Sequence, residues 1–224
     1  MSLLKGSLPV VAIDGPAGAG KSTVARLVAR RLGWQYVDTG AMYRTVTLLA
    51  RERGLESEDE WAALMDELEF SFRDERVLAN GRDLTTAIRT PEISRASRAI
   101  ADSPKVREAA RRKQRAFARA GRVVMEGRDV GTFVVPAARY KFYLDAAAEE
   151  RARRHLRSLK EKGIEADYES VLADLKARDE ADMNRPIAPL MRAEDAFYLD
   201  TTHLGREQVV DFIAGIVEAD ETGT

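Results

Sequence analysis

The chain has no cysteine among its 224 residues. This absence excludes disulfide bridges, thiolate metal sites and a cysteine nucleophile, and it fits a reducing cytoplasm, where we expect the protein to work. Long apolar runs are also missing, because nowhere do about 18 apolar residues follow one another. The N-terminus lacks the apolar stretch and cleavage site of a signal peptide. We therefore expect a soluble protein that does not contact a membrane.

An excess of charge of either sign is also lacking, because 36 basic residues face 37 acidic ones. The chain therefore has no net field to attract nucleic acid. A basic segment, 104–122, starts with a proline and ends at a glycine, which predicts a helix. No aromatic platform interleaves its basic residues, so we interpret it as a solvated helix face and not as a nucleic-acid arm. We expect a monomer without a nucleic-acid partner.

Five short apolar runs end in an acidic residue or include one, and they predict buried strands of a parallel sheet. The runs are "PVVAID" to Asp14, "WQYVD" to Asp38, "RVVMEGRD" around Glu126, "YKFYLD" to Asp145 and "AFYLD" to Asp200. Amphipathic helical patterns lie between them, at 24–32 and 209–217 among others. Strands that alternate with helices predict an α/β domain with helices on both faces of the sheet, and the length fits one domain over residues 1–224.

One segment departs from this alternation. Residues 68–85, "LEFSFRDERVLANGRDLT", alternate apolar and polar side chains, and Asn80-Gly81 suits a tight turn. We expect a small antiparallel unit inserted in the α/β body.

The segment "GPAGAGKS", from Gly15 to Ser22, matches the phosphate-loop pattern G-x-x-x-x-G-K-[ST] between a predicted strand and a predicted helix. Its glycines let backbone N–H groups turn toward an anion at the helix N-terminus. The pattern predicts that Lys21 reaches the β and γ phosphates of a nucleotide and that Ser22 binds Mg²⁺. The predicted ATP site comprises Gly15, Pro16, Ala17, Gly18, Ala19, Gly20, Lys21, Ser22 and Thr23.

Three further stretches lie where the predicted strands end, at the edge where open α/β sheets bind ligands. They are "DTGAMYR" with Thr39 and Arg44, "EGRDVGT" with Arg128 and Asp129, and "KARDEADMNR" with Arg178, Asp182 and Arg185. The last three are spaced i, i+4 and i+7, which predicts one face of a helix, although an ordinary surface ion pair would also explain them. An acceptor that is itself a phosphate needs several such cations, whereas water needs fewer. The sequence therefore favours a kinase with a phosphorylated acceptor.

The motifs "IDGPAGAGKST", "DTGAMYR", "RTPEIS", "SPKVRE", "EGRDVGT", "KFYLDA", "EERA" and "RDEADMNRPIAPL" occur in this order over most of residues 10–200. In this set the sequence closely resembles the bacterial cytidylate kinases. The resemblance implies a P-loop nucleoside monophosphate kinase fold, with a central parallel five-stranded sheet flanked by helices. It also implies a core at about 1–63, 101–150 and 166–224, a monophosphate-binding insert at about 64–100 and a short lid at about 151–165.

The same resemblance implies transfer of the ATP γ-phosphoryl group to CMP or dCMP, with Mg²⁺ as cofactor. Thr39, Ser97, Arg107 and Asp129 would then surround the cytosine, where the family usually has Ser at the position of Thr39. Arginine can donate to the O2 and N3 atoms of cytosine, and a carboxylate can accept from its N4 amino group. Arg44, Arg128 and Arg185 would clamp the acceptor phosphate, and Arg178 and Asp182 would lie near ribose and phosphate.

In the lid, Arg151 and Arg154 are the candidates for stabilising developing charge, and His155 stands where the family usually has a second consecutive arginine. With Lys21, Arg128 and Arg185 they form the predicted catalytic set. Glu126, at a strand end, is a hypothetical Mg²⁺ contact through water. The alternatives are a kinase for UMP or AMP on the same fold, or a nucleotide switch, although a guanine-reading N-K-x-D motif is absent.

Overall fold

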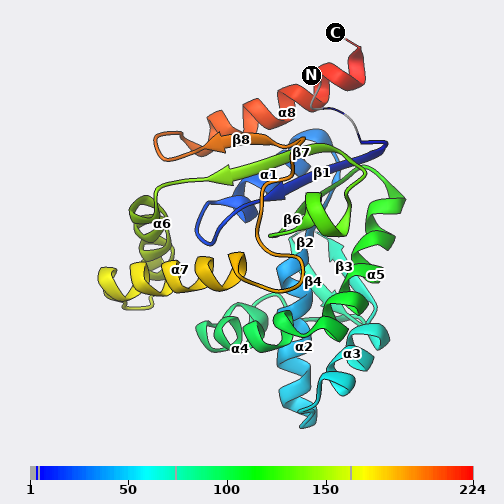
Figure 1. The fold of residues 1–224 in the computed structure, drawn as a ribbon, viewed down its shortest axis with the longest axis vertical. Coiled ribbons are helices and arrows are strands. Elements are labelled where there is room, and N and C mark those ends of the chain that lie inside the picture. The colour runs from blue at the N-terminus through cyan, green and yellow to red at the C-terminus, as the bar shows by residue number, and fades with distance from the viewer. Residues whose placement is uncertain (1–3, 5, 74, 162, 224) are drawn as a thin grey trace.

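The computed structural model describes residues 4, 6–73, 75–161 and 163–223 and is built on a parallel sheet (Figure 1). The sheet has five strands in the order β2-β6-β1-β7-β8. They are β1 (Leu8–Asp14), β2 (Gln35–Asp38), β6 (Val123–Glu126), β7 (Ala138–Asp145) and β8 (Phe197–Asp200). Each corresponds to one of the five predicted runs, so the predicted parallel sheet is confirmed.

Successive side chains of β1 enter two different hydrophobic cores, which explains why its run is apolar without alternation. Val10 and Ala12 pack on the side covered by α2 (Thr39–Arg53) and α5 (Pro104–Ala120). Val11 and Ile13 pack on the side of α1 (Lys21–Leu32) and α8 (Arg206–Thr222). Helices thus cover both faces of the sheet, as predicted (Figure 1).

The register of the strands brings three carboxylates to one edge of the sheet. Glu126 pairs with Asp38 on one side and with Ile13, the neighbour of Asp14, on the other. Because parallel strands end at the same edge, the loops that follow Asp14, Asp38 and Glu126 meet there.

A second, antiparallel sheet contains β3 (Phe70–Arg73), β4 (Arg76–Ala79) and β5 (Arg82–Asp83), which confirms the predicted small unit. Asn80 and Gly81 connect β4 to β5 with φ values of 47° and 78°, the left-handed conformation that a tight hairpin turn needs. Three more elements adjoin this sheet in the chain: α3 (Glu58–Glu67), η1 (Ala87–Arg89) and α4 (Pro91–Asp102).

Two further helices, α6 (Ala148–Glu161) and α7 (Tyr168–Met183), lie side by side beyond β7 (Figure 1). Helix α7 carries Arg178 and Asp182 but ends before Arg185, so the prediction that all three share one helix is wrong for Arg185. Pro186 follows it, and a residue before proline is disfavoured in helical geometry.

A short turn, η2 (Val130–Val134), follows β6. Within the described part of the chain, no helix has the length and apolarity to cross a membrane. Residue 74 of the predicted antiparallel unit, residue 162 of the predicted lid, and residues 1–3, 5 and 224 of the predicted domain lie outside the described residues.

Candidate active site

The phosphate loop joins β1 to α1, and its glycines are required by geometry. A Cβ on Gly15 would lie 1.9 Å from the carbonyl oxygen of Leu144, and Gly20 precedes the helix with φ 87°. The ammonium group of Lys21 donates to the Pro16 carbonyl at 2.7 Å, within the loop. Burial, aided by the Arg128 guanidinium, lowers the pKa of Lys21 to about 7. A bound phosphate would favour its charged form.

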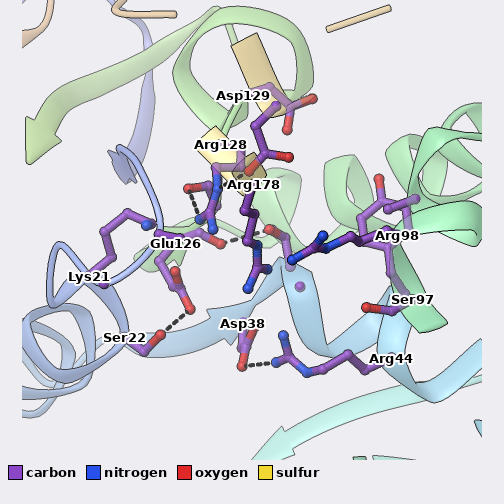
Figure 2. Close-up of a pocket in the computed structure, with 18 of the residues that line it drawn as sticks. Lys21, Ser22, Asp38, Arg44, Ser97, Arg98, Glu126, Arg128, Asp129 and Arg178 are labelled. Atoms are coloured by element: carbon purple, nitrogen blue, oxygen red, sulfur yellow. Dashed lines mark hydrogen bonds and ion pairs between the residues drawn. The ribbon is translucent and has the colours of Figure 1, made fainter. Parts of the chain in front are cut away.

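Ser22 and Glu126 meet beside the loop (Figure 2). The Ser22 hydroxyl donates to the Glu126 carboxylate at 2.6 Å. Burial, and then the nearby Asp38 carboxylate, raise the pKa of Glu126. The described residues contain no cluster of three or more acidic, histidine or cysteine side chains able to hold a metal ion by themselves. A cation bound by Ser22 and Glu126 would therefore complete its coordination with substrate oxygens.

Asp38 and Arg44 form an ion pair of 2.8 Å at the start of α2. The Asp38 carboxylate also accepts the Ala41 N–H at 2.8 Å, so it caps the helix from which Arg44 projects. Thr39 donates its hydroxyl to the Glu126 backbone carbonyl at 2.7 Å, which joins the residue after β2 to the end of β6.

Arg107 and Asp129 form a buried ion pair of 2.5 Å. Arg107 is only 4% exposed and also donates to the Ala101 carbonyl at 3.0 Å. The Nε atoms of Arg107 and Arg44 are buried, and neither has a hydrogen-bond partner among the described residues. Buried donors in this state fit a site that a polar ligand completes.

Asp182 bridges two arginines of the cleft. Arg128 donates to it at 2.8 Å, Arg185 donates to its other oxygen, and Arg185 also donates to Asp102 at 3.1 Å. Burial acts to raise the pKa of Asp182, but the guanidinium groups of Arg128, Arg185 and Arg178 together outweigh it, and the pKa is lowered. Burial, together with repulsion from Arg128, lowers the pKa of Arg178 to about 10. The cleft thus contains more positive charge than its own carboxylates neutralise.

Asp14 is a functional candidate that the sequence analysis missed. Its carboxylate accepts the backbone N–H groups of Val130 and Gly131 at 2.8 and 2.7 Å, and so fixes the loop that carries Arg128 and Asp129. Burial raises the pKa of Asp14 to about 7. Its position at the end of a strand beside the glycine loop is the signal that could have identified it.

These groups surround one cleft of about 430 Å³. The predicted site residues that line it are Ala17, Gly18, Gly20, Lys21, Ser22, Thr23, Thr39, Arg44, Ser97, Arg107, Glu126, Arg128, Asp129, Arg154, Arg178, Asp182 and Arg185. Asp38, Arg98 and Asp102 also line it and were not predicted. Charged partners of this kind have no local sequence signal, because the fold brings them together from different elements.

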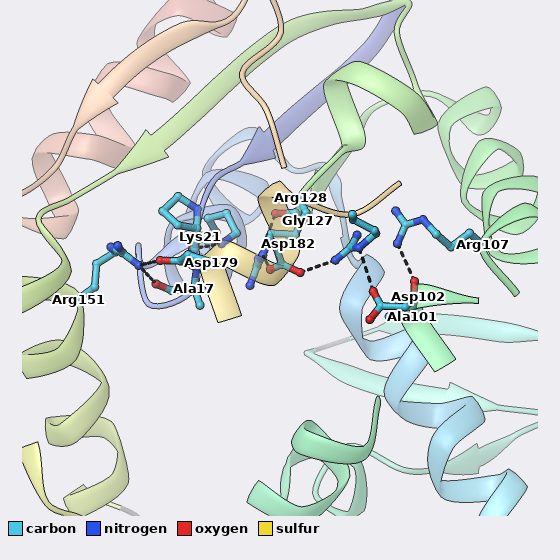
Figure 3. A network of polar contacts seen from close by, with 12 residues as sticks. Ala17, Lys21, Ala101, Asp102, Arg107, Gly127, Arg128, Arg151, Asp179 and Asp182 are labelled. Carbon is cyan, nitrogen blue, oxygen red and sulfur yellow. Dashed lines mark hydrogen bonds and ion pairs between the residues drawn. The ribbon is translucent and has the colours of Figure 1, made fainter. Parts of the chain in front are cut away.

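The two lid arginines are placed differently. Arg154 lines the cleft and donates to the hydroxyl of Thr201 at 3.0 Å and to its carbonyl at 2.5 Å. Arg151 is not among the lining residues, and its guanidinium points to the Ala17 carbonyl, 2.8 Å away, and to Asp179 (Figure 3).

A phosphate loop on a parallel five-stranded sheet, with converging arginines across one cleft, defines a P-loop kinase. The cytidylate kinase family model matches residues 11–219. A cytidylate kinase of Shewanella sp. (strain MR-4) is 47% identical over 91% of this chain and 92% of that protein. The chain belongs to the cytidylate kinase family.

One further relative agrees with this membership, and one solved structure shares the fold. A cytidylate kinase of Geobacter sulfurreducens (strain ATCC 51573 / DSM 12127 / PCA) is 48% identical over 96% of this chain and 95% of its own. The crystal structure of an uncharacterized protein from Eubacterium ventriosum ATCC 27560 is similar with a TM-score of 0.53, at 12% identity, over 95% of this chain and 99% of that one. The last likeness concerns the fold alone.

Proposed function

We infer that the chain transfers the γ-phosphoryl group of ATP to CMP or dCMP, giving ADP and CDP or dCDP. The observation that carries this function is that one cleft contains both the phosphate loop and the Arg107–Asp129 pair. The first suits a triphosphate, and the second offers the donors and the acceptor that cytosine requires. The alternative acceptors UMP and AMP are not favoured.

We propose that Arg107 and Asp129 read the base, with Thr39 and Ser97 beside them. Uracil would offer the Asp129 carboxylate an oxygen where cytosine offers an amino group, which would leave buried polar groups unpaired. Such a mismatch costs roughly 1–3 kcal/mol per group. Discrimination would then follow without an editing step.

For the phosphates, we propose that Arg44, Arg128 and Arg185 clamp the acceptor, with Arg178 and Asp182 near its ribose. Arg154 would stabilise the charge that develops between the two nucleotides. The sequence predicts the same role for Arg151, but its guanidinium is directed at Ala17 and Asp179. A phosphate monoester is largely dianionic near neutral pH, so its oxygen needs no general base. Catalysis would consist of positioning and electrostatic stabilisation.

Mg²⁺ fits this site because Ser22 and Glu126 present adjacent oxygens beside the phosphate loop. We propose that Ser22 ligates the ion directly and Glu126 through water. The ion would neutralise charge on the phosphate oxygens. For Glu126→Gln we expect that a higher Mg²⁺ concentration is needed for half-maximal turnover, measured by titration at saturating ATP. An unchanged Mg²⁺ requirement would refute the role of Glu126.

We further propose the division into a core (about 1–63, 101–150 and 166–224), an insert that embraces the acceptor (about 64–100) and a lid (about 151–165). The small sheet β3-β4-β5 supports the insert, because all three strands fall within it, and α6 covers most of the proposed lid (Figure 1). A monomeric protein in the cytoplasm, without nucleic-acid partners, completes the proposal.

The decisive experiment is a coupled assay of ADP release with ATP and Mg²⁺ across CMP, dCMP, UMP and AMP. We expect the highest kcat/KM with CMP or dCMP. Equal values with CMP and UMP would refute the assignment of Arg107 and Asp129, and ATP hydrolysis that ignores CMP would refute phosphoryl transfer altogether.

A further inference from the structure

One residue of the phosphate loop, Ala17, is held through both of its backbone polar groups by the α6–α7 helix pair. The N–H of Ala17 donates to Asp179 of α7 at 2.9 Å, and its carbonyl accepts from Arg151 of α6 at 2.8 Å. Figure 3 shows both side chains directed at the Ala17 backbone, away from the arginines of the cleft. Because the Ala17 N–H is committed to Asp179, it does not serve a phosphate oxygen.

The two side chains that bind the Ala17 backbone are themselves paired and buried. Arg151 is 7% exposed and Asp179 6%. The Arg151 guanidinium also contacts the second oxygen of Asp179 and donates through Nε to the Ala146 carbonyl at 2.8 Å. A buried ion pair contributes little to stability compared with apolar side chains, so its presence here is better explained by the geometry that it imposes.

Apolar contacts reinforce the connection. The Ala17 side chain packs in a small separate core with Ala152 of α6 and with Val171 and Leu175 of α7. At the next position, a Cβ on Gly18 would lie 3.1 Å from the Cβ of Arg151, and φ there is 76°. The tip of the phosphate loop is therefore seated on α6 and α7, and this close approach requires glycine.

We propose that Arg151 and Asp179 are a positioning pair that holds the phosphate loop in its anion-binding shape, so that the α6–α7 pair sets the affinity for ATP. The proposal rests on ATP as the donor in the proposed function. It differs from the direct phosphate contact predicted for Arg151 from the sequence. A positioning pair requires both members, whereas a direct contact requires only Arg151.

The test compares Asp179→Asn, Arg151→Lys and the double variant, with Asp174→Asn and Arg153→Lys as matched controls at exposed positions of the same two helices. ATP affinity is measured by calorimetry without acceptor, and KM values for ATP and CMP are measured in the coupled assay. We expect each single variant to lower the affinity for ATP by about tenfold or more, and the double variant to lower it no further. The KM for CMP and the controls should change by less than about twofold.

Parental ATP affinity in Asp179→Asn would overturn the proposal. A double variant whose loss of ATP affinity equals the product of the two single losses would overturn it as well. A loss confined to Arg151→Lys would instead assign Arg151 to direct phosphate contact. Equal losses for ATP and CMP would indicate general damage to the fold and would also reject the pair as a specific device. If the parental protein binds ATP but does not phosphorylate CMP, the proposed acceptor is wrong. The positioning role of Arg151 and Asp179 would still be tested, because it is measured by ATP affinity.

Discussion

Two buried groups beside the phosphate loop have pKa values far from their ordinary ones. Burial lowers the pKa of Lys21 to about 7, and burial raises the pKa of Asp14 to about 7. For Lys21 the cost to folding accumulates as pH falls from its ordinary value of 10.5, since the unfolded chain binds the proton more tightly. For Asp14 the cost accumulates as pH rises from 3.8. The folded protein thus keeps these two groups beside the phosphate loop at an electrostatic cost, which a bound anion would change.

The first prediction concerns Lys21. Because phosphate favours the charged lysine, ATP binding at about pH 8 should take up a fraction of a proton, and at about pH 6 nearly none. Calorimetry in buffers of different ionisation enthalpy measures this uptake. Lys21→Arg keeps the charge but does not titrate near pH 7, so uptake should fall sharply in that variant. Equal uptake in the two proteins would show that another group titrates.

The second prediction concerns Asp129. Asp129→Ala removes the proposed acceptor for the cytosine amino group, so the ratio of kcat/KM for CMP to that for UMP should fall about 10- to 100-fold. The ratio is independent of the fraction of active protein, which protects it against a loss of stability. Glu92→Ala, an exposed carboxylate on α4, is the control. A ratio equal to that of the parent would exclude base reading by Asp129.

Among the elements, helix α5 shows how local sequence positions a functional side chain. Ser103 caps the helix by accepting the Val106 N–H at 3.4 Å, and its hydroxyl donates to Glu58 at 2.8 Å. Pro104 occupies the first turn, where its missing N–H costs nothing. Arg107 follows within the next turn, so the start of the helix determines where the guanidinium lies.

The third prediction follows from this cap. Ser103→Ala should lower the free energy of unfolding by about 1–2 kcal/mol, because it removes the N-cap of α5 and the hydroxyl that donates to Glu58. Urea unfolding measures the change. Ser94→Ala, in the interior of α4, should cost less than about 0.5 kcal/mol. Similar losses in both variants would mean that the cap contributes nothing special.

The elements also show how far sequence reasoning extends. The five strands, the phosphate loop and the Asn80-Gly81 hairpin were predictable because each depends on residues next to one another in the chain. Helix α3 was not predicted, although its capping box of Ser57 and Glu60 is a local signal. The pairing of Arg151 with Asp179 had no such signal, since the fold alone brings these two distant positions together. The roles of Asp14 and Asp38 were missed for a related reason, because a strand-ending carboxylate has no assigned partner until the neighbouring loops are placed.

For the molecule as a whole, the arginines of the cleft lower the stability of the fold and favour the binding of anions. Arg44, Arg128 and Arg178 converge on one hollow, and burial and mutual repulsion lower the pKa of Arg178 to about 10. The repulsion among these arginines destabilises the folded protein without anions. Binding of two phosphorylated nucleotides would offset that repulsion. Functional sites commonly have this cost.

The fourth prediction tests both effects. Arg178→Met should raise the free energy of unfolding of the ligand-free protein by about 1 kcal/mol while turnover with CMP falls. Lys176→Met, at an exposed position of the same helix, should leave both nearly unchanged. Thermal and urea unfolding give the first quantity, and the coupled assay gives the second. A variant less stable than the parent would show that Arg178 is a structural residue.

Helix α7 reaches two parts of the cleft, because Asp179 binds the phosphate loop and Asp182 binds Arg128 and Arg185. One helix thus connects the groups on both sides of the cleft. We expect the two binding events to be coupled, and by reciprocity each nucleotide would change the affinity for the other by the same factor.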